Sequence, residues 1–97
     1  MINNDIYLQE FIGNYIEVIS SSNNNNIGLH GYVVDETKNT LIIDHSGKQK
    51  VVPKAYSKFR IWISGNPYDL EGSLIIMKPE DRTKEKKKIF KKLRRND

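Results

Sequence analysis

The chain has 97 residues, of which 37% are hydrophobic and 29% are charged, and it contains no cysteine. This length fits one small domain, and the lack of cysteine excludes disulfides and thiolate metal sites. The net charge of +4 is unevenly spread: residues 1–81 carry seven basic and ten acidic side chains, whereas residues 82–97 carry nine and two. Such a basic end indicates either a polyanionic partner or a solubilising tail.

The first residues lack the basic and apolar regions of a signal peptide. The apolar runs are also too short to cross a bilayer. We therefore expect a cytoplasmic protein with no membrane partner.

The chain begins with a predicted helix, strand and loop. Residues 5–12 place apolar side chains at helical spacing, with Asn4 or Asp5 as a cap and Gly13 as a stop. Residues 15–20 are β-branched and aromatic, which favours a strand. The polar run at 20–26 predicts a mobile loop.

Several short strands are predicted in the middle of the chain. In residues 27–36 a strand pattern is interrupted by Gly28 and Gly31, which indicates sharp curvature or a bulge. Further strands are expected at residues 40–44, at 49–52 before Pro53, and at 57–63. In the last of these, Phe59, Ile61 and Ile63 share one face, and Lys58, Arg60 and Trp62 share the other.

The last elements complete a mainly β pattern. Residues 68–71 predict a short strand, residues 73–77 one more, and Pro79 suits the first turn of a helix. About six close strands predict a small antiparallel barrel with short N- and C-terminal helices; a two-layer α+β domain is the alternative. We divide this single domain into an N-terminal helix (1–13), the barrel (14–78) and a basic helix or tail (79–97).

No constellation of residues indicates protein catalysis or a metal site. The carboxylates, such as Asp35, Glu36, Asp44 and Asp69, lie at predicted turns or strand ends, where acidic residues are common. His30 and His45 are not part of a ligand or catalytic pattern, and no glycine-rich loop matches a phosphate-binding motif. We therefore predict no catalytic and no metal-binding residues.

Basic residues are the best candidates for a functional site. A first group surrounds one predicted hairpin and the strand after it, and a second group lies in the tail. Contacts from the tail to phosphates would give affinity for RNA without recognition of its base sequence. Tyr56 and Trp62 can stack on bases, cover a partner, or simply pack. The predicted RNA-binding residues are Lys48, Lys50, Lys54, Lys58, Arg60, Arg82, Lys84, Lys86, Lys87 and Lys88.

The stretch VVDETKNTLII at residues 33–43 is similar to the central stretch of the archaeal ribonuclease P protein component 1 family. Residues 16–22, 50–54 and 70–72, leading to 78–82, also resemble that family in order and approximate spacing. The resemblance covers roughly residues 11–85. The run of asparagines at 23–26 and the detail of the tail depart from the family pattern.

The resemblance implies an Sm-like (SH3-like) barrel that serves as a non-catalytic subunit of ribonuclease P, in which a catalytic RNA uses Mg²⁺ to remove 5′ leaders from precursor tRNA. It implies no cofactor on the protein itself. The implied partners are the ribonuclease P RNA, precursor tRNA, the zinc-ribbon ribonuclease P protein and other protein subunits. By the same resemblance, protein contact is expected at Tyr7, Phe11, Ile12, Leu29 and Tyr32.

Two other functions stay open. A generic Sm- or SH3-like adaptor, or an RNA-binding module of another ribonucleoprotein, would have the same composition. A small metal-dependent nuclease would require carboxylates such as Asp35 and Glu36 to act in the isolated chain.

Overall fold

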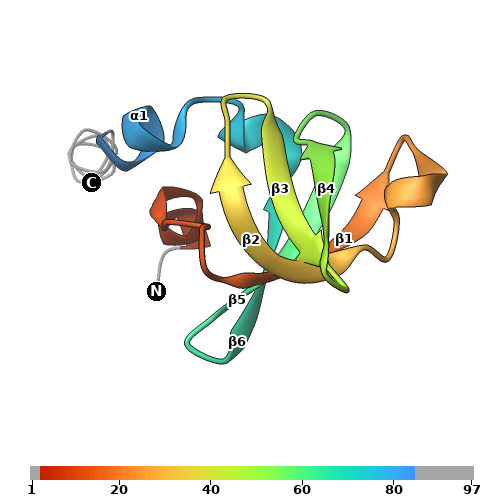
Figure 1. The fold of residues 1–97 in the computed structure, drawn as a ribbon. Helices are drawn as coiled ribbons and strands as arrows, with labels where there is room; N and C mark the ends of the chain where they lie inside the picture. Colours follow the sequence, from red (N-terminus) through yellow and green to blue (C-terminus); the bar gives the residue numbers. More distant parts are fainter. Residues whose placement is uncertain (1–2, 85–97) are drawn as a thin grey trace.

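Six antiparallel strands form one curved sheet in this computed structural model, which describes the backbone of residues 3–84 and the side chains of residues 6–82. The sheet order is β4-β3-β2-β1-β5-β6, and the strands curl around a common interior (Figure 1). The strands are β1 (Tyr15–Ser21), β2 (His30–Glu36), β3 (Thr40–His45), β4 (Lys48–Pro53), β5 (Ser57–Ile63) and β6 (Asn66–Glu71).

Alternating apolar residues build the core from the inner face of the sheet. Ile16 lies opposite Ile61 and Val18 lies opposite Phe59 across the β1–β5 pair, and all four are fully buried. Residues directly opposite each other point to the same face, so these pairs pack against each other. Burial of each such side chain contributes about 1.5–3 kcal/mol. The predicted alternation of β5 is confirmed.

Two glycines let backbone segments approach closely. A Cβ atom at Gly31 would lie 1.9 Å from the carbonyl oxygen of Asp44, and one at Gly72 would lie 1.8 Å from that of Lys54. Only glycine fits at such positions. Strand β2 also has a register shift between Val33 and Asp35. The irregularity predicted for this strand is therefore present, but it lies at Val33–Asp35 rather than at a glycine, and Gly28 precedes the strand.

The N-terminal segment is helical, as predicted, but its bounds differ from the expected residues 5–12. It forms a 3₁₀ helix, η1 (Asn3–Leu8), after which the chain turns towards β1. The backbone N–H of Gly13 donates to the carbonyl of Val33, and Phe11 is fully buried. Because an isolated short helix is marginal, this tertiary packing decides the local conformation.

Two further segments contain short 3₁₀ helices that the sequence did not predict. The polar loop contains a 3₁₀ turn, η2 (Asn24–Asn26), which is capped by the Asn23 side chain accepting from the N–H of Asn25 at 3.0 Å. The expected strand at 73–77 is instead the 3₁₀ helix η3 (Gly72–Ile75), which buries Ile75.

The C-terminal helix α1 (Pro79–Lys84) begins at the predicted proline. The remainder of the predicted tail lies outside the described residues. None of the helices in residues 3–84 has the length and apolar character needed to cross a membrane.

Candidate nucleic-acid and protein interfaces

Lys48 and Lys50 lie exposed on the same face of β4, opposite His45 and Ile43. Within residues 6–82 neither lysine forms an ion pair. Two positions along a strand span about 6.6–6.8 Å, so both ammonium groups are free to meet neighbouring phosphates. RNA contact by these two lysines stays a prediction.

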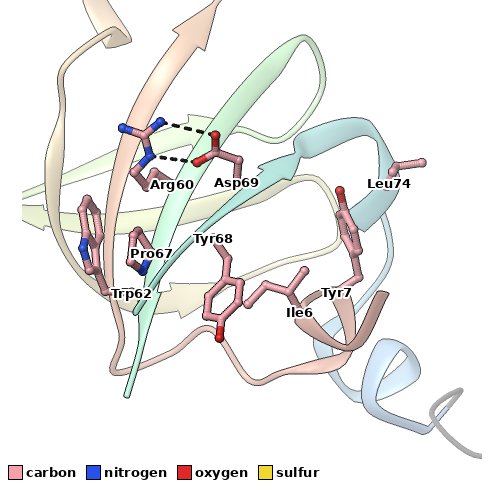
Figure 2. Close-up of a pocket in the computed structure, with 8 residues that line it drawn as sticks. All are labelled: Ile6, Tyr7, Arg60, Trp62, Pro67, Tyr68, Asp69 and Leu74. Atoms are coloured by element: carbon pink, nitrogen blue, oxygen red, sulfur yellow. Dashed lines mark hydrogen bonds and ion pairs between the residues drawn. The ribbon is translucent and has the colours of Figure 1, made fainter. Parts of the chain in front are cut away.

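The two predicted cations of β5 are already paired with carboxylates of β6. Lys58 Nζ lies 3.2 Å from Glu71, and Arg60 donates to both carboxylate oxygens of Asp69 at 2.8 and 3.3 Å (Figure 2). The hydrogen bond from Arg60 lowers the pKa of Asp69, and the same bond raises the pKa of Arg60. An RNA phosphate would have to compete with these pairs, so RNA contact at Lys58 and Arg60 also stays a prediction.

Lys54 is not a surface residue, although it is one of the predicted RNA-binding residues. Its side chain is fully buried, and Nζ donates to Glu36 Oε2 at 2.8 Å. Three carbonyls also lie within bonding distance of Nζ, those of Thr37 at 2.7 Å, Lys38 at 3.2 Å and Met77 at 3.1 Å, so at least one of the three N–H groups is shared between two acceptors. Burial lowers the pKa of Lys54, and the bond to Glu36 opposes this shift. The prediction of phosphate contact at Lys54 is wrong, because every bonding position of the ammonium group is occupied inside the protein.

Arg82 of α1 is also buried, and the prediction that it contacts RNA is wrong because its guanidinium group lies inside the protein. Its Nη2 donates to Glu36 Oε1 at 2.6 Å, and its Nη1 donates to the carbonyls of Tyr7, at 3.1 Å, and Gln9. The guanidinium carbon lies 3.9 Å from the ring centroid of Phe11, in cation–π geometry. Burial lowers the pKa of Arg82, and Glu36 opposes this shift.

Glu36, Lys54 and Arg82 thus form one buried cluster, which we name the Glu36 cluster. Its members come from the end of β2, the residue after β4, and α1. Each member also belongs to one of the sequence segments that carry the family resemblance, so these segments meet in space. Through Arg82, the cluster fixes α1 against the barrel and against the carbonyls of Tyr7 in η1 and of Gln9 just after it.

Of the five predicted partner residues, Phe11 is the one that the structure places wholly in the core. The prediction that its side chain contacts a partner is therefore wrong. Tyr7 and Leu29 are half-buried and pack against the core. Ile12 and Tyr32 are exposed and remain available to a partner.

An aromatic cluster that the sequence did not predict lies on the outer face of the sheet. Tyr15 contacts Tyr32 and Trp62 with ring centroids 5.3 and 5.6 Å apart, both in edge-to-face geometry. The Tyr15 hydroxyl lies 2.5 Å from Nδ1 of His30, whose ring is 4.9 Å from that of His45. The alternation of side chains along β1 and β5 could have predicted this cluster, because it places Tyr15 and Trp62 on the face opposite the buried one.

The carboxylates do not assemble into an ion site within the part of the chain that is described. No group of three His, Asp or Glu side chains there is close enough to hold a metal ion. Both oxygens of Glu36 are engaged by Lys54 and Arg82, and Asp35 accepts from the backbone N–H of Glu36 at 2.8 Å.

Comparisons with known proteins agree with this architecture. The family model "Ribonuclease P/MRP, subunit p29" matches residues 4–85. Ribonuclease P protein component 1 of Thermoplasma volcanium is 46% identical over 88 residues, covering 91% of this chain and 96% of the relative. The equivalent protein of Archaeoglobus fulgidus is 41% identical over 80 residues, covering 82% of this chain and 78% of the relative.

A solved structure is also similar: Mth11, described as a homologue of human RNase P protein Rpp29. It superposes with a TM-score of 0.59 at 33% identity, covering 76% of this chain and 97% of that chain. The predicted Sm-like antiparallel barrel is thereby confirmed. The resemblance seen in residues 33–43 is confirmed as well, and the chain belongs to the ribonuclease P/MRP subunit p29 family.

Proposed function

We propose that this chain is a non-catalytic protein subunit of ribonuclease P that binds RNA and assists the catalytic RNA in removing 5′ leaders from precursor tRNA. The observation that carries the proposal is the family match over residues 4–85, together with relatives named as ribonuclease P protein component 1. On this proposal Mg²⁺ is used by the RNA, the protein needs no cofactor of its own, and the complex acts in the cytoplasm.

Electrostatic attraction to the RNA backbone is the proposed mode of binding. Arg82 is used inside the fold, but residues 83–97 still contain eight basic and two acidic side chains, a balance of +6. On the barrel, Lys48 and Lys50 are exposed and unpaired within the described residues. Phosphate contacts from these groups would release counterions, so the affinity should fall steeply with salt.

The proposed protein partners are the zinc-ribbon ribonuclease P protein and further subunits of the complex. Ile12 and Tyr32 support this proposal because both are large, exposed apolar or aromatic side chains on the barrel surface. Exposed apolar groups of this kind commonly mark protein contacts.

The direct experiment is reconstitution. The purified chain is added to the ribonuclease P RNA and its companion proteins, and 5′-leader removal from a precursor tRNA is measured at modest Mg²⁺. We expect the rate to rise when the chain is present and to stay low when it is left out. An equal rate with and without the chain would contradict the proposal.

One observation favours an adaptor role for the barrel itself. Residues 3–82 contain eight basic and ten acidic side chains, and two of those basic side chains, Lys54 and Arg82, are buried. Removal of residues 85–97 separates the two roles. RNA affinity that survives the deletion would place RNA binding on the barrel, whereas loss of affinity with retained protein binding would make the barrel an adaptor with an RNA-binding tail.

A further inference from the structure

A row of aromatic side chains crosses the outer face of the sheet. Tyr32 lies opposite Tyr15, Tyr15 opposite Trp62, and Trp62 opposite Pro67, so the row runs through β2, β1, β5 and β6. We call these four residues, three aromatic side chains and one proline, the aromatic row. Tyr32 is 59% exposed, and the edge-to-face contacts hold the rings in place. Because these rings are already held in place, a partner that binds here loses little side-chain conformational entropy by ordering them.

An open groove of about 840 Å³ continues the aromatic row around β6, the edge strand of the sheet. Figure 2 shows Trp62 and Pro67 on one side of β6, with Tyr68, Ile6 and Tyr7 on the other. Leu74 closes the far side of the groove, although 59% of its surface is exposed. The lining of the groove therefore combines apolar side chains, which extend from the sheet face to the gap between β6 and η1, with the Arg60–Asp69 ion pair.

The free edge of β6 is poorly suited to pair with a strand from another protein. Pro67 has no backbone N–H to donate. The N–H of Glu71 is already bonded to the hydroxyl of Tyr7 at 3.3 Å. An occupant of the groove must therefore bind through side chains rather than by extending the sheet.

The charges around the aromatic row decide between RNA and protein. Asp44 lies opposite Tyr32, and Glu17 and Asp69 both lie opposite Arg60 in the next row of the face. Glu17 and Asp69 thus flank the Arg60 guanidinium, which is held by Asp69, while Asp44 lies at the β3 end of the aromatic row. This acidic surrounding repels phosphate groups and attracts cationic side chains, which also bind favourably over Tyr and Trp rings.

We propose that the aromatic row and its groove dock a non-strand segment of another ribonuclease P protein, one that presents an Arg or Lys side chain beside apolar side chains. The inference rests on the proposed function, because it assigns a surface to that partnership. Two of the residues expected to contact a partner, Tyr7 and Tyr32, border this surface; Tyr15, Trp62 and Leu74 are added to it.

Trp62 is the single tryptophan of the chain and lies within the aromatic row. Replacing it with 5-fluorotryptophan gives one fluorine NMR signal from the surface in question. The probe is the purified, zinc-loaded zinc-ribbon ribonuclease P protein, added to the full-length chain. We expect the signal to shift in proportion to the fraction bound.

Leu74→Ser and Val51→Ser provide a matched pair, since the two side chains are 59% and 60% exposed and Val51 lies on β4, at the opposite edge of the sheet. We expect Leu74→Ser to weaken binding of the zinc-ribbon protein by about tenfold, as for a central apolar contact. Val51→Ser should change it by less than about twofold. Thermal unfolding of both variants checks that each is folded.

Glu17→Lys tests the sign of the occupant's charge. If the docked segment is cationic, we expect the variant to bind the zinc-ribbon protein about fivefold more weakly than the unaltered chain does. The difference between the two affinities should be smaller at high salt. If ribonuclease P RNA, rather than the protein, shifted the Trp62 signal, and if Glu17→Lys strengthened that binding, the inference would be overturned in favour of RNA.

Two further results separate this inference from the proposed function. If the zinc-ribbon protein bound the chain without shifting the Trp62 signal, and with equal affinity for the Leu74→Ser and Glu17→Lys variants, the docking surface would be wrong and the partnership would stand. If the zinc-ribbon protein did not bind the unaltered chain at all, the proposed partnership would fail together with this inference.

Discussion

A carboxylate oxygen of Glu36 lies 2.6 Å from a guanidinium nitrogen of Arg82, although the two residues are 46 positions apart in the chain and both are buried. The other carboxylate oxygen binds Lys54. One negative charge therefore holds two positive charges inside a small barrel. Because Arg82 also binds the carbonyls of Tyr7 and Gln9, this cluster joins both ends of the described chain to the sheet.

Glu36→Ala should destabilise the fold strongly. The substitution leaves two buried cations without their anion, and removal of one partner from a buried ion pair costs about 3–5 kcal/mol. The free energy of unfolding, measured with urea, checks this value. Glu71→Ala is the control, because its ion pair with Lys58 is exposed and should contribute less than about 1 kcal/mol. Similar losses in the two variants would show that the Glu36 cluster is not a main source of stability.

Gly72→Ala should also be severe. The new methyl group would overlap the carbonyl oxygen of Lys54, so the backbone next to the Glu36 cluster must move. We expect a loss of about 3 kcal/mol or more. Since each kcal/mol shifts the melting temperature of a domain this size by about 4–8 °C, calorimetry should detect a fall of roughly ten degrees or more.

Gly65→Ala is a suitable comparison for that substitution. Gly65 has φ +82° and no atom within 4 Å of an added Cβ, so the cost is backbone strain alone, about 1–2 kcal/mol. A smaller effect at position 72 than at position 65 would contradict the close approach seen at Gly72.

The ion pair between Asp69 and Arg60 should make the free energy of unfolding depend slightly on pH in the acid range. Its pKa is lowered in the fold by the bond from Arg60, so its contribution is present above the ordinary carboxyl pKa. The contribution is lost as the pH falls through the lowered value. Because the pair is largely exposed, we expect less than about 1 kcal/mol. Urea titrations from pH 2 to 6 should show this loss in the unaltered chain and not in Asp69→Asn.

Replacement of Lys48 and Lys50 together by Gln should weaken RNA binding and reduce its salt dependence. Each lost phosphate contact lowers the slope of log affinity against log salt by about 0.7–0.9, so two contacts give roughly 1.4–1.8. Filter binding over a range of salt concentrations measures the slope. Lys38→Gln is the matched control, because that exposed lysine lies between β2 and β3 and is not among the predicted RNA contacts. An unchanged slope in the double variant would exclude these lysines from the RNA interface.

The strands could be predicted because their signals are local. Alternation in β5 and the stop at Pro53 describe single segments, and the structure follows them. The segment after β6 could not be predicted in this way. It reads as apolar and β-prone, but Gly72 must lie against the Lys54 carbonyl, and the chain turns into η3 instead of continuing as a strand.

The Glu36 cluster could not be predicted from local patterns. Simple alternation from the buried Val33 would point Asp35 inwards, but the register shift between those residues moves the inward position to Glu36, opposite the buried Leu41. A basic residue beside a hairpin also looks the same in sequence whether it faces solvent or a buried carboxylate. The sequence therefore cannot distinguish Lys54, or Arg82 in the basic C-terminal segment, from a lysine or arginine that contacts RNA.

The central position of β1 has a consequence for how fast the protein reaches its native state. Strands β2, β3 and β4 pair with their neighbours in sequence, but β1 lies between β2 and β5 and pairs with both. The β1–β5 ladder joins segments separated by three other strands. The long connecting chain must therefore lose conformational entropy before the contacts between β1 and β5 can form. Domains dominated by such non-local pairing fold in about milliseconds to seconds rather than microseconds. Formation of the β1–β5 ladder is therefore the expected rate-limiting event.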